Sequence, residues 1–296
     1  MTIDFKPLIE ARFQLGESPV YDDRRVALWY CDIVNRALHR VTLASLELAT
    51  WTFPSEACSI GLTESGRIAI ALRDEVGIFD PDNGGYERIA QIALNASEAR
   101  LNDGKVGPDG AFWVGSLAKK EGGSRPPAGA LYRVDAAGKV ERKVDSIATA
   151  NGLAFSPDGS VMFHTDTNAP AWIDRWDFEA ASGAISNRQR IATPDDTIGR
   201  PDGGASDVEG CYWSAGFSAG RLNRFSPGGK LLETQQLSVA APTMPCFGGD
   251  GLKTLFVTSS RDGIAKDILE RYPLTGSVLV AQSPVSGSPV SRFRDQ

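Results

Sequence analysis

Short apolar runs alternate with clusters of polar turn residues along nearly the whole chain. The runs are about 4 to 7 residues long and are bounded by Gly, Pro, Asp and Asn, which is typical of strands joined by tight turns. Apolar residues at helical spacing are scarce. The pattern therefore predicts a mainly β protein.

The turns recur at regular intervals. A polar residue followed by glycine precedes an apolar run in most of the units, and one unit has arginine in place of the glycine. The pairs are Asp23-Arg24, Ser65-Gly66, Asp109-Gly110, Asp158-Gly159, Glu209-Gly210 and Asp250-Gly251. Their second members are separated by 42, 44, 49, 51 and 41 residues. This period indicates six structural units.

A second repeat, apolar-x-Arg-apolar, is interleaved with the first and is expected to be an amphipathic strand in each unit. It occurs as LHRV (38–41), LYRV (131–134), IDRW (173–176), LNRF (222–225) and LERY (269–272), with GIFD (77–80) as a divergent copy. A unit of this size cannot bury its own faces, so neighbouring units must stack and the array must cap or close. We therefore expect an all-β, six-bladed β-propeller forming a single domain over residues 1–296. A two-sheet sandwich of unrelated hairpins is the alternative.

Composition narrows the function classes. The 296 residues include 31 Lys+Arg and 37 Asp+Glu, giving a net charge of −6, and 42% of the residues are hydrophobic. This balance is typical of a globular protein and offers no basic surface for nucleic acid. Asp4, Lys6 and Glu10 interrupt the N-terminal segment where a signal peptide needs an apolar run, and no stretch is long enough to span a membrane. We expect a cytoplasmic protein without a membrane partner.

The four cysteines lie far apart and show no CxxC spacing. They are Cys31, Cys58, Cys211 and Cys246, mostly beside apolar or aromatic residues. They are expected to be buried free thiols, with disulfides or a zinc site as the alternative.

Three polar residues occupy equivalent positions in successive units. Asn102, Asn151 and Asp202 each lie seven residues before the first residue of their own turn pair, and Glu17 lies six before Asp23. Asn-Gly and Pro-Asp-Gly are also ordinary turn sequences, so a turn role is the alternative for Asn151 and Asp202. Equivalent positions in successive blades face the same end of the central channel. These side chains are therefore expected to converge there.

The expected cluster contains oxygen donors and no histidine or thiol. Such a donor set suits a hard divalent cation, Ca²⁺, Mg²⁺ or Mn²⁺, with Zn²⁺ or Fe²⁺ less favoured. A metal held by only a few protein ligands keeps coordination positions open for water and substrate, as in a catalytic metal site. The chain has only two histidines. His39 is expected to be a packing or surface residue, and His164 either a strand histidine or a site residue.

Several segments resemble the signatures of the senescence marker protein-30, gluconolactonase and luciferin-regenerating-enzyme family. They are LGESPVYDD with LWYCDI, RLNDGKVGPDGAFWVGS, ANGLAFSPDGSVMFHTD, PDGGASDVEGCYWSA and PCFGGDGLKTLFVTSSRDG. The resemblance implies a six-bladed propeller with one divalent metal held by Glu17, Asn151 and Asp202. It also implies that Arg100 and Asn102 contact substrate hydroxyls and water.

The same resemblance implies hydrolysis of a sugar lactone to the aldonic acid. The metal would polarise the carbonyl, and Asp202 would act as general base toward the attacking water. Many members carry a methionine and then a carboxylate after the strand that is AFWVGS here, whereas this chain has Leu117, Lys119 and Lys120. Lys120 is therefore a candidate substrate-binding residue that could favour a different hydroxyl pattern or an acidic substrate.

Three other functions are alternatives to a sugar lactonase. The same metal site could hydrolyse another ester or an organophosphate. A calcium-binding or ligand-binding propeller could use these residues without turnover. The third alternative is a structural scaffold.

Overall fold

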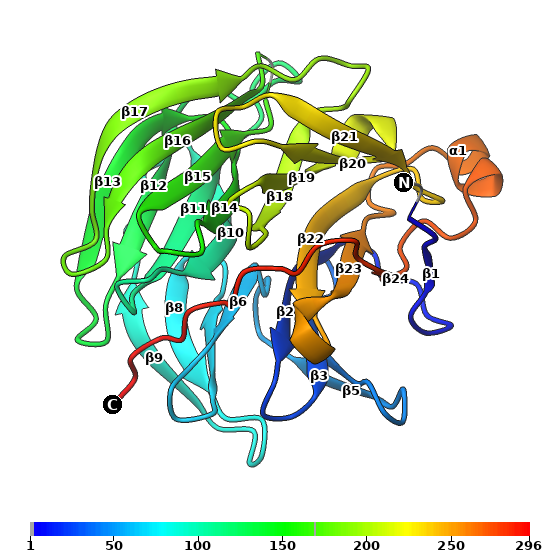
Figure 1. Cartoon of the computed structure of the whole chain (residues 1–296). Helices are drawn as coiled ribbons and strands as arrows, with labels where there is room; N and C mark the ends of the chain where they lie inside the picture. The colour runs from blue at the N-terminus through cyan, green and yellow to red at the C-terminus, as the bar shows by residue number, and fades with distance from the viewer. Residues whose placement is uncertain (1–2, 169) are drawn as a thin grey trace.

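The computed structural model describes residues 3–168 and 170–296, and the strands in these residues form six antiparallel four-stranded sheets. The sheets radiate from a common axis as the blades of a propeller (Figure 1). The predicted all-β, six-bladed propeller is confirmed.

Five blades are built from four consecutive strands each. The first comprises β2 (Gly16–Asp22), β3 (Ala27–Asp32), β4 (Ala37–Thr42) and β5 (Leu48–Thr52). The second comprises β6 (Ser59–Leu62), β7 (Ile68–Ala71), β8 (Glu75–Phe79) and β9 (Tyr86–Gln91). The third comprises β10 (Glu98–Val106), β11 (Phe112–Ala118), β12 (Gly129–Val134) and β13 (Val140–Ile147). The fourth comprises β14 (Ala150–Phe155), β15 (Val161–Asp166), β16 (Trp172–Glu179) and β17 (Ala184–Ala192). The fifth comprises β18 (Pro201–Ser206), β19 (Tyr212–Gly216), β20 (Arg221–Phe225) and β21 (Leu231–Gln236).

The sixth blade joins the two ends of the chain. Its strands are β22 (Pro242–Gly248), β23 (Thr254–Ser259), β24 (Leu279–Gln282) and, from the N-terminal segment, β1 (Lys6–Pro7). β1 pairs antiparallel with β24, so the first strand of the chain completes the last blade and closes the ring. Closure removes the open side that a row of blades would otherwise leave.

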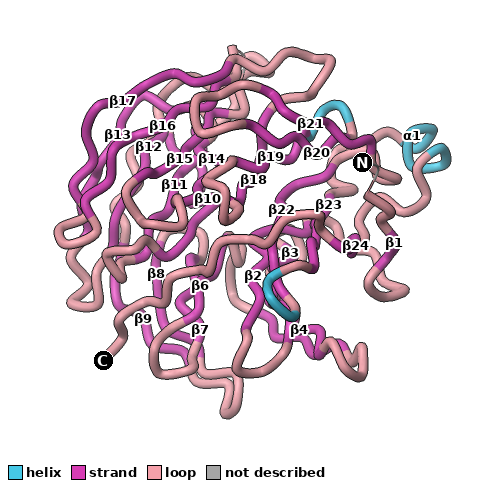
Figure 2. The backbone as a smooth tube through the Cα atoms, viewed as in Figure 1, coloured by secondary structure: helices cyan, strands magenta, loops and turns pink. Residues whose placement is uncertain are grey.

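All six predicted turn pairs lie between the first and second strands of a blade. Five of the six copies of the second repeat lie in the third strands, as expected. The prediction for LERY (269–272) is wrong, because these residues belong to α1 (Lys266–Arg271) and the tyrosine that caps it. The run KDILER consists mostly of helix formers, with Lys266 and Glu270 one helical turn apart at 3.8 Å. Besides α1, two single-turn 3₁₀ helices, Phe217–Ala219 and Asp250–Leu252, interrupt the strands in the described residues (Figure 2).

The two repeats recur together because their polar residues bind each other. In the third blade, Arg133 of the second repeat donates from Nε to Asp109 Oδ2 of the turn (2.7 Å), and Trp113 Nε1 donates to Asp109 Oδ1 (3.1 Å). In the fifth blade, Arg224 Nε donates to Asp207 Oδ2 at 2.8 Å. Each such ion pair ties the turn to the third strand and satisfies a buried carboxylate.

The core lies between neighbouring blades. The second strands are rich in aromatic and β-branched residues and are almost fully buried, and Trp29, Trp113 and Trp213 are among the largest buried side chains. The fourth strands alternate between exposed and half-buried positions because they form the outer edges of the blades. Burial thus increases from the rim toward the axis, where the first strands of adjacent blades contact one another.

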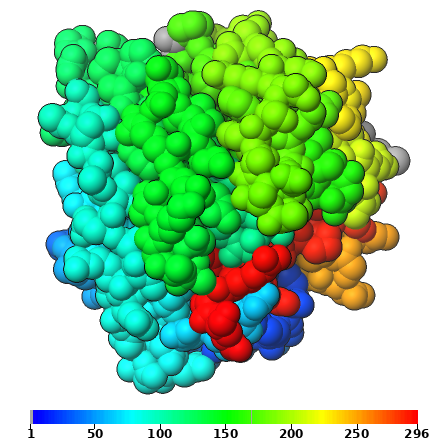
Figure 3. Space-filling model, turned by 90° about the vertical axis from the view of Figure 1, so that its left-hand side faces the viewer, coloured from blue at the N-terminus to red at the C-terminus, as the bar shows by residue number. Residues whose placement is uncertain are grey.

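The C-terminal segment after β24 crosses one end of the channel. Ser288 N donates to Ser206 O (2.9 Å), Phe293 N to Leu62 O (2.8 Å) and Arg294 N to Gly110 O (3.1 Å). The segment therefore links the fifth blade to the second and third, and Figure 3 shows it in red on the surface between them. Among the described residues, no helix is long and apolar enough to cross a membrane.

Candidate functional site

β-Bulges interrupt the axial strands at the candidate residues. Register shifts occur between Glu17 and Val20, Leu101 and Gly104, Asn151 and Ala154, Pro201 and Gly204, and Pro242 and Pro245. The remaining axial strand, β6, pairs with β7 without a shift and supplies none of the candidate residues. A bulge breaks the strict alternation of a strand and re-aims a side chain, which accounts for polar side chains on otherwise apolar strands.

Hydrogen bonds link four of the predicted residues into one chain. Arg100 Nη1 donates to Asn102 Oδ1 (2.8 Å), and Asn102 Nδ2 donates to Asn151 Oδ1 (2.7 Å). Asn151 Nδ2 in turn donates to Asp202 Oδ1 (2.6 Å). The structure thus brings together residues from three blades at the end of the channel where β14 and β18 begin.

The backbone around Asn151 is fixed by its neighbours. Thr167 Oγ1 accepts from Asn151 Nδ2 (2.7 Å) and donates to Pro201 O (2.7 Å). Gly152 has φ +65°, in the left-handed region, and its carbonyl accepts from the Tyr212 hydroxyl (2.8 Å). A Cβ on Gly152 would collide with that hydroxyl and with Thr165. Asn151 therefore has little freedom to move away from Asp202.

Glu17 is held by the bulge in β2. Ser18 has φ +50°, donates its amide to Glu17 Oε2 (2.9 Å), and accepts Ile60 N at its hydroxyl (2.9 Å). The hydroxyl of Thr243, at the β22 bulge, binds the carbonyl of Gly16. Glu17 is only 7% exposed, as is Asp202.

Without a bound cation, the charged forms of the Glu17 and Asp202 carboxylates are electrostatically unfavourable. Burial, followed by the charges of Asp202 and Asp103, raises the pKa of Glu17 well above its ordinary value. Burial and Asp103 likewise raise the pKa of Asp202, against smaller opposite effects of Arg200 and Arg100. The site therefore concentrates negative charge where little water can screen it.

The buried Asp103 and the half-buried Lys105 are residues of the site that the sequence-based prediction did not assign. Asp103 Oδ2 accepts Leu153 N (3.0 Å), whereas its Oδ1 has no hydrogen-bond partner among the described residues. Lys105 Nζ donates to Gly204 O (3.0 Å). Burial lowers the pKa of Lys105, and Asp103 opposes that effect. Their position in RLNDGKVG, around the β10 bulge, is the one signal in the sequence that could have pointed to them.

Other predicted residues lie away from this cluster. Lys120 is exposed in the loop after β11, and its side chain makes no hydrogen bond or ion pair with any described residue. His39 packs against Phe13 and Tyr30 and binds the Thr50 hydroxyl, in agreement with a packing role. His164 is buried in β15 without a partner for either ring nitrogen in the described residues, so it is a strand histidine whose polar atoms are not satisfied.

All four cysteines are buried free thiols, as predicted. The alternative of disulfides is therefore wrong. No group of three or more His, Cys, Asp and Glu side chains in the described residues has the arrangement of a metal site. Glu17, Asn151 and Asp202 form a different kind of set, because one of its three members is a carboxamide.

The chemistry of this set fits a hard divalent cation. Its two carboxylates carry oxygen ligands, which Ca²⁺, Mg²⁺ and Mn²⁺ prefer, and Asn151 would add a third through the remaining lone pair of Oδ1, the atom that accepts Asn102 Nδ2. The raised pKa values of Glu17 and Asp202 have the same origin, an excess of buried negative charge that a divalent cation would neutralise. The residues present therefore suit the metal that the sequence predicts.

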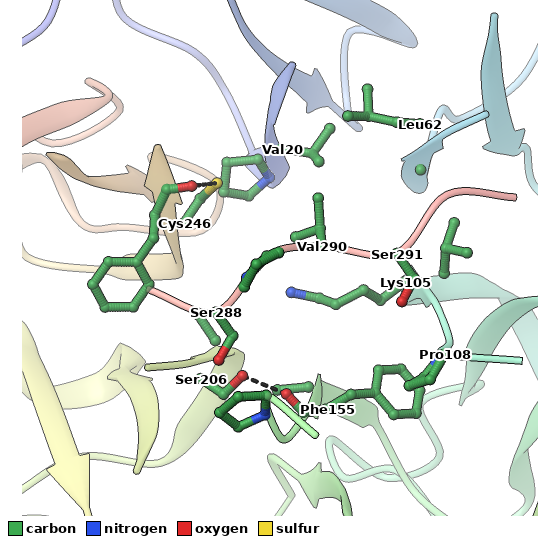
Figure 4. Close-up of a pocket in the computed structure, with 18 of the residues that line it drawn as sticks. Val20, Leu62, Lys105, Pro108, Phe155, Ser206, Cys246, Ser288, Val290 and Ser291 are labelled. Carbon is green, nitrogen blue, oxygen red and sulfur yellow. Dashed lines mark hydrogen bonds between the residues drawn. The ribbon is translucent and has the colours of Figure 1, made fainter. Parts of the chain in front are cut away.

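A cavity of about 240 Å³ lies toward the other end of the same strands. Its lining includes Val20, Lys105, Phe155 and Cys246, with Val290 of the C-terminal segment beside them (Figure 4). Glu17, Asn151 and Asp202 are not part of this lining. The Lys105 ammonium points into the cavity, so this residue lies between the two ends of the channel.

A family model for the SMP-30/gluconolactonase/LRE-like region matches residues 15–261. The chain belongs to this family. It is 37% identical to a 6-deoxy-6-sulfogluconolactonase from Pseudomonas putida over 274 residues, covering 92% of each chain. It is 33% identical to an L-arabinolactonase from Azospirillum brasilense over 290 residues, covering 97% of this chain and 94% of that one. Among solved structures, regucalcin, a calcium-binding protein from Agrobacterium tumefaciens, superposes with a TM-score of 0.92 at 26% identity, covering 99% and 98% of the two chains.

Proposed function

We propose that the protein hydrolyses a sugar lactone to the corresponding aldonic acid at the channel end formed by Glu17, Asn151 and Asp202. The observation that carries this proposal is the chain of hydrogen bonds from Arg100 through Asn102 and Asn151 to Asp202. Two relatives that match the chain over nearly its whole length are named as lactonases, which supports hydrolysis of a carboxylic ester as the reaction class.

In the proposed site, Glu17, Asn151 and Asp202 hold one divalent cation. The bound ion would polarise the lactone carbonyl and stabilise the negative charge that develops on its oxygen. The regucalcin similarity supports Ca²⁺ as one candidate, and Mg²⁺, Mn²⁺, Zn²⁺ and Fe²⁺ complete the set to be tested.

The remaining steps belong to the protein's own side chains. Asp202 accepts a proton from the attacking water as general base. Asn151 orients Asp202 through the 2.6 Å hydrogen bond. Arg100 donates hydrogen bonds to substrate hydroxyls, and Asn102 accepts one with the second lone pair of Oδ1, which the 2.8 Å contact with Arg100 keeps in position.

A lactone panel tests this proposal. D-glucono-1,5-lactone, L-arabinono-1,4-lactone, an arylester and a phosphotriester are assayed at constant pH by titration of released acid, with the uncatalysed rate subtracted. Asp202→Asn is compared with Asp174→Asn, a carboxylate buried in β16 and bound by Arg188 at 2.6 Å. We expect lactone turnover by the wild-type chain and by D174N, and loss of turnover in D202N even at saturating metal.

Two results would contradict the proposal. Turnover of arylester or phosphotriester in place of every lactone would indicate the other hydrolase activity of the same site. Metal binding without turnover of any of the four substrates would indicate a binding protein.

A further inference from the structure

The loop between β11 and β12 brings a second arginine to the candidate site. The guanidinium of Arg125 donates from Nη1 to the carbonyl of Ala118, the last residue of β11. The backbone carbonyl of Arg125 accepts Asn168 Nδ2 (3.1 Å), and Asn168 directly follows Thr167, the residue that binds Asn151. Both contacts fix Arg125 at the same end of the channel as Asn151.

Arg100 lies beside this anchor point. In the pairing of β10 with β11, Arg100 is opposite Leu117, which is adjacent to the Ala118 carbonyl that binds Arg125. Burial and the charge of Arg100 both lower the pKa of Arg125, as expected for two guanidinium groups held near each other. Both side chains are only partly buried, so a substrate can reach them.

A third guanidinium completes this arginine group, which we define as Arg100, Arg125 and Arg200. Arg200 directly precedes β18, two residues before Asp202, and its side chain is only partly buried. In the part of the chain that the structure describes, no arginine of the group has a carboxylate oxygen within 4.0 Å. Arg142, by contrast, pairs with the buried carboxylate of Glu98.

Nearby carboxylates already have other partners. Asp166 accepts the amides of Ala148 (2.7 Å) and Thr149 (2.9 Å) with its two oxygens. Glu56 pairs with Arg73 at 2.8 Å. These acids therefore do not compensate the arginine group.

The charges of the site do not balance. A divalent cation would neutralise Glu17 and Asp202, and Lys105 compensates Asp103. The arginine group is then left as a positive rim on a protein whose net charge is −6, and the exposed Lys119, Lys120 and Glu121 in the loop of Arg125 add one further positive charge. A partly desolvated cationic rim favours a ligand with an anionic group.

We propose that the lactone hydrolysed at this site carries an oxyanion group remote from the lactone carbonyl, and that Arg125 binds that group. This inference rests on the proposed function and narrows its substrate to acidic sugar lactones. A phosphate, a sulfonate and a carboxylate share the chemistry that a guanidinium recognises, namely paired acceptor oxygens with negative charge.

The test measures kcat/KM for neutral and anionic lactones of the same ring. D-glucono-1,5-lactone is compared with its 6-phosphate, its 6-deoxy-6-sulfonate and the 6-carboxylate analogue. Arg125→Gln removes the charge, and Arg125→Lys keeps it without the planar donor pair. Arg12→Gln is the matched control, because Arg12 is also half-buried and binds only the carbonyls of Ala11 (2.9 Å) and Pro273 (3.1 Å).

We expect at least one anionic lactone to exceed the neutral one about 10-fold or more in kcat/KM. R125Q should abolish this preference, because about 10-fold is the size expected for one hydrogen bond to a charged group, and should change the neutral lactone less than about 3-fold. R125K should retain part of the preference, and R12Q all of it. Raising the salt concentration from 0.05 to 0.5 M should weaken only the anionic reaction.

The inference is overturned if the wild-type chain prefers the neutral lactone, or if R125Q slows all the lactones equally. Failure of the lactonase proposal is recognised separately, by the absence of turnover for every lactone. In that case, calorimetric titration with 6-phosphogluconate and gluconate tests whether Arg125 binds an anionic group. Tighter binding of the phosphate by the wild-type chain but not by R125Q supports Arg125 as its partner, and equal binding of the two sugar acids refutes it.

Discussion

Replacement of Asp202 by asparagine should raise the stability of the metal-free protein and remove most of the stabilisation that a bound metal provides. The carboxylate is 7% exposed, and its pKa is raised by burial and by Asp103. Because the folded pKa lies above the unfolded one, the metal-free native state is destabilised at any pH above the unfolded value near 3.9. The substituted asparagine would carry no charge, and its own carboxamide oxygen could still accept from Asn151 Nδ2.

The size of the effect follows from the burial. Leaving a buried polar or charged group without compensation costs about 1–3 kcal/mol or more. Removing the charge should therefore stabilise the metal-free protein by about 1–3 kcal/mol, or about 2–6 °C in Tm for a chain of this size. In the wild-type chain, metal at about 100 times its Kd should add about 2.7 kcal/mol, and D202N should lose most of this gain.

Differential scanning calorimetry at pH 7.5 measures both effects on protein treated with a chelator and then dialysed. Each variant is scanned without metal and with one divalent metal at a time. D174N is the control, because Asp174 is fully buried but bound by Arg188 and Arg190. D174N should be less stable than the wild-type chain by about 1–2 kcal/mol, since it weakens the hydrogen bonds to two arginines that are themselves partly exposed, and should keep the full response to metal. A lower Tm of metal-free D202N, or an unchanged metal response in D202N, would refute the reasoning.

Three further predictions concern other parts of the fold. Burial lowers the pKa of His164 to about 4, below the ordinary value near 6.5 of an unfolded histidine. The free energy of unfolding should therefore decrease by about 2 kcal/mol as the pH is lowered from 8 to 5. Urea unfolding across that range should give a flatter profile for His164→Phe, and parallel profiles would exclude His164 as the cause. Gly152→Ala should lower the free energy of unfolding by about 2–4 kcal/mol, because the position has a positive φ and the added Cβ would collide with Tyr212. It should also weaken metal binding in calorimetric titration, and an unaltered metal affinity would mean that Gly152 does not support the site. Phe293→Ala should lower the free energy of unfolding in urea by about 3 kcal/mol, because Phe293 is 1% exposed. It should leave kcat/KM within about 2-fold, and a large loss of activity would mean that the C-terminal segment affects the site.

The fold was predictable because each blade repeats the same physical solution. The turn pairs and the arginine of the second repeat are visible in sequence, and in the third blade Asp109 and Arg133 bind each other. The error at LERY arose because the last blade inserts α1 before its third strand and takes its fourth strand from the N-terminal segment. A short pattern cannot reveal pairing with a strand more than 250 residues away.

The candidate site was partly predictable for the same reason. Equal spacing from the turns placed Asn102, Asn151 and Asp202 at one level of the channel, and the structure links them by hydrogen bonds. The bulges that re-aim these side chains have no distinct sequence signal apart from nearby glycines. Arg125 was missed because its position depends on how an irregular loop folds back on β11, whereas Lys120, in the same loop, is exposed.

Metal titration of lactone hydrolysis tests the central claim most directly. Chelator-treated protein is titrated with each divalent metal in turn, and hydrolysis of a lactone from the panel is followed at constant pH. The account predicts negligible activity without metal and a rise that saturates at one equivalent per chain in the wild-type protein but not in D202N. Full activity after chelation, with no bound metal detected by elemental analysis, would contradict it.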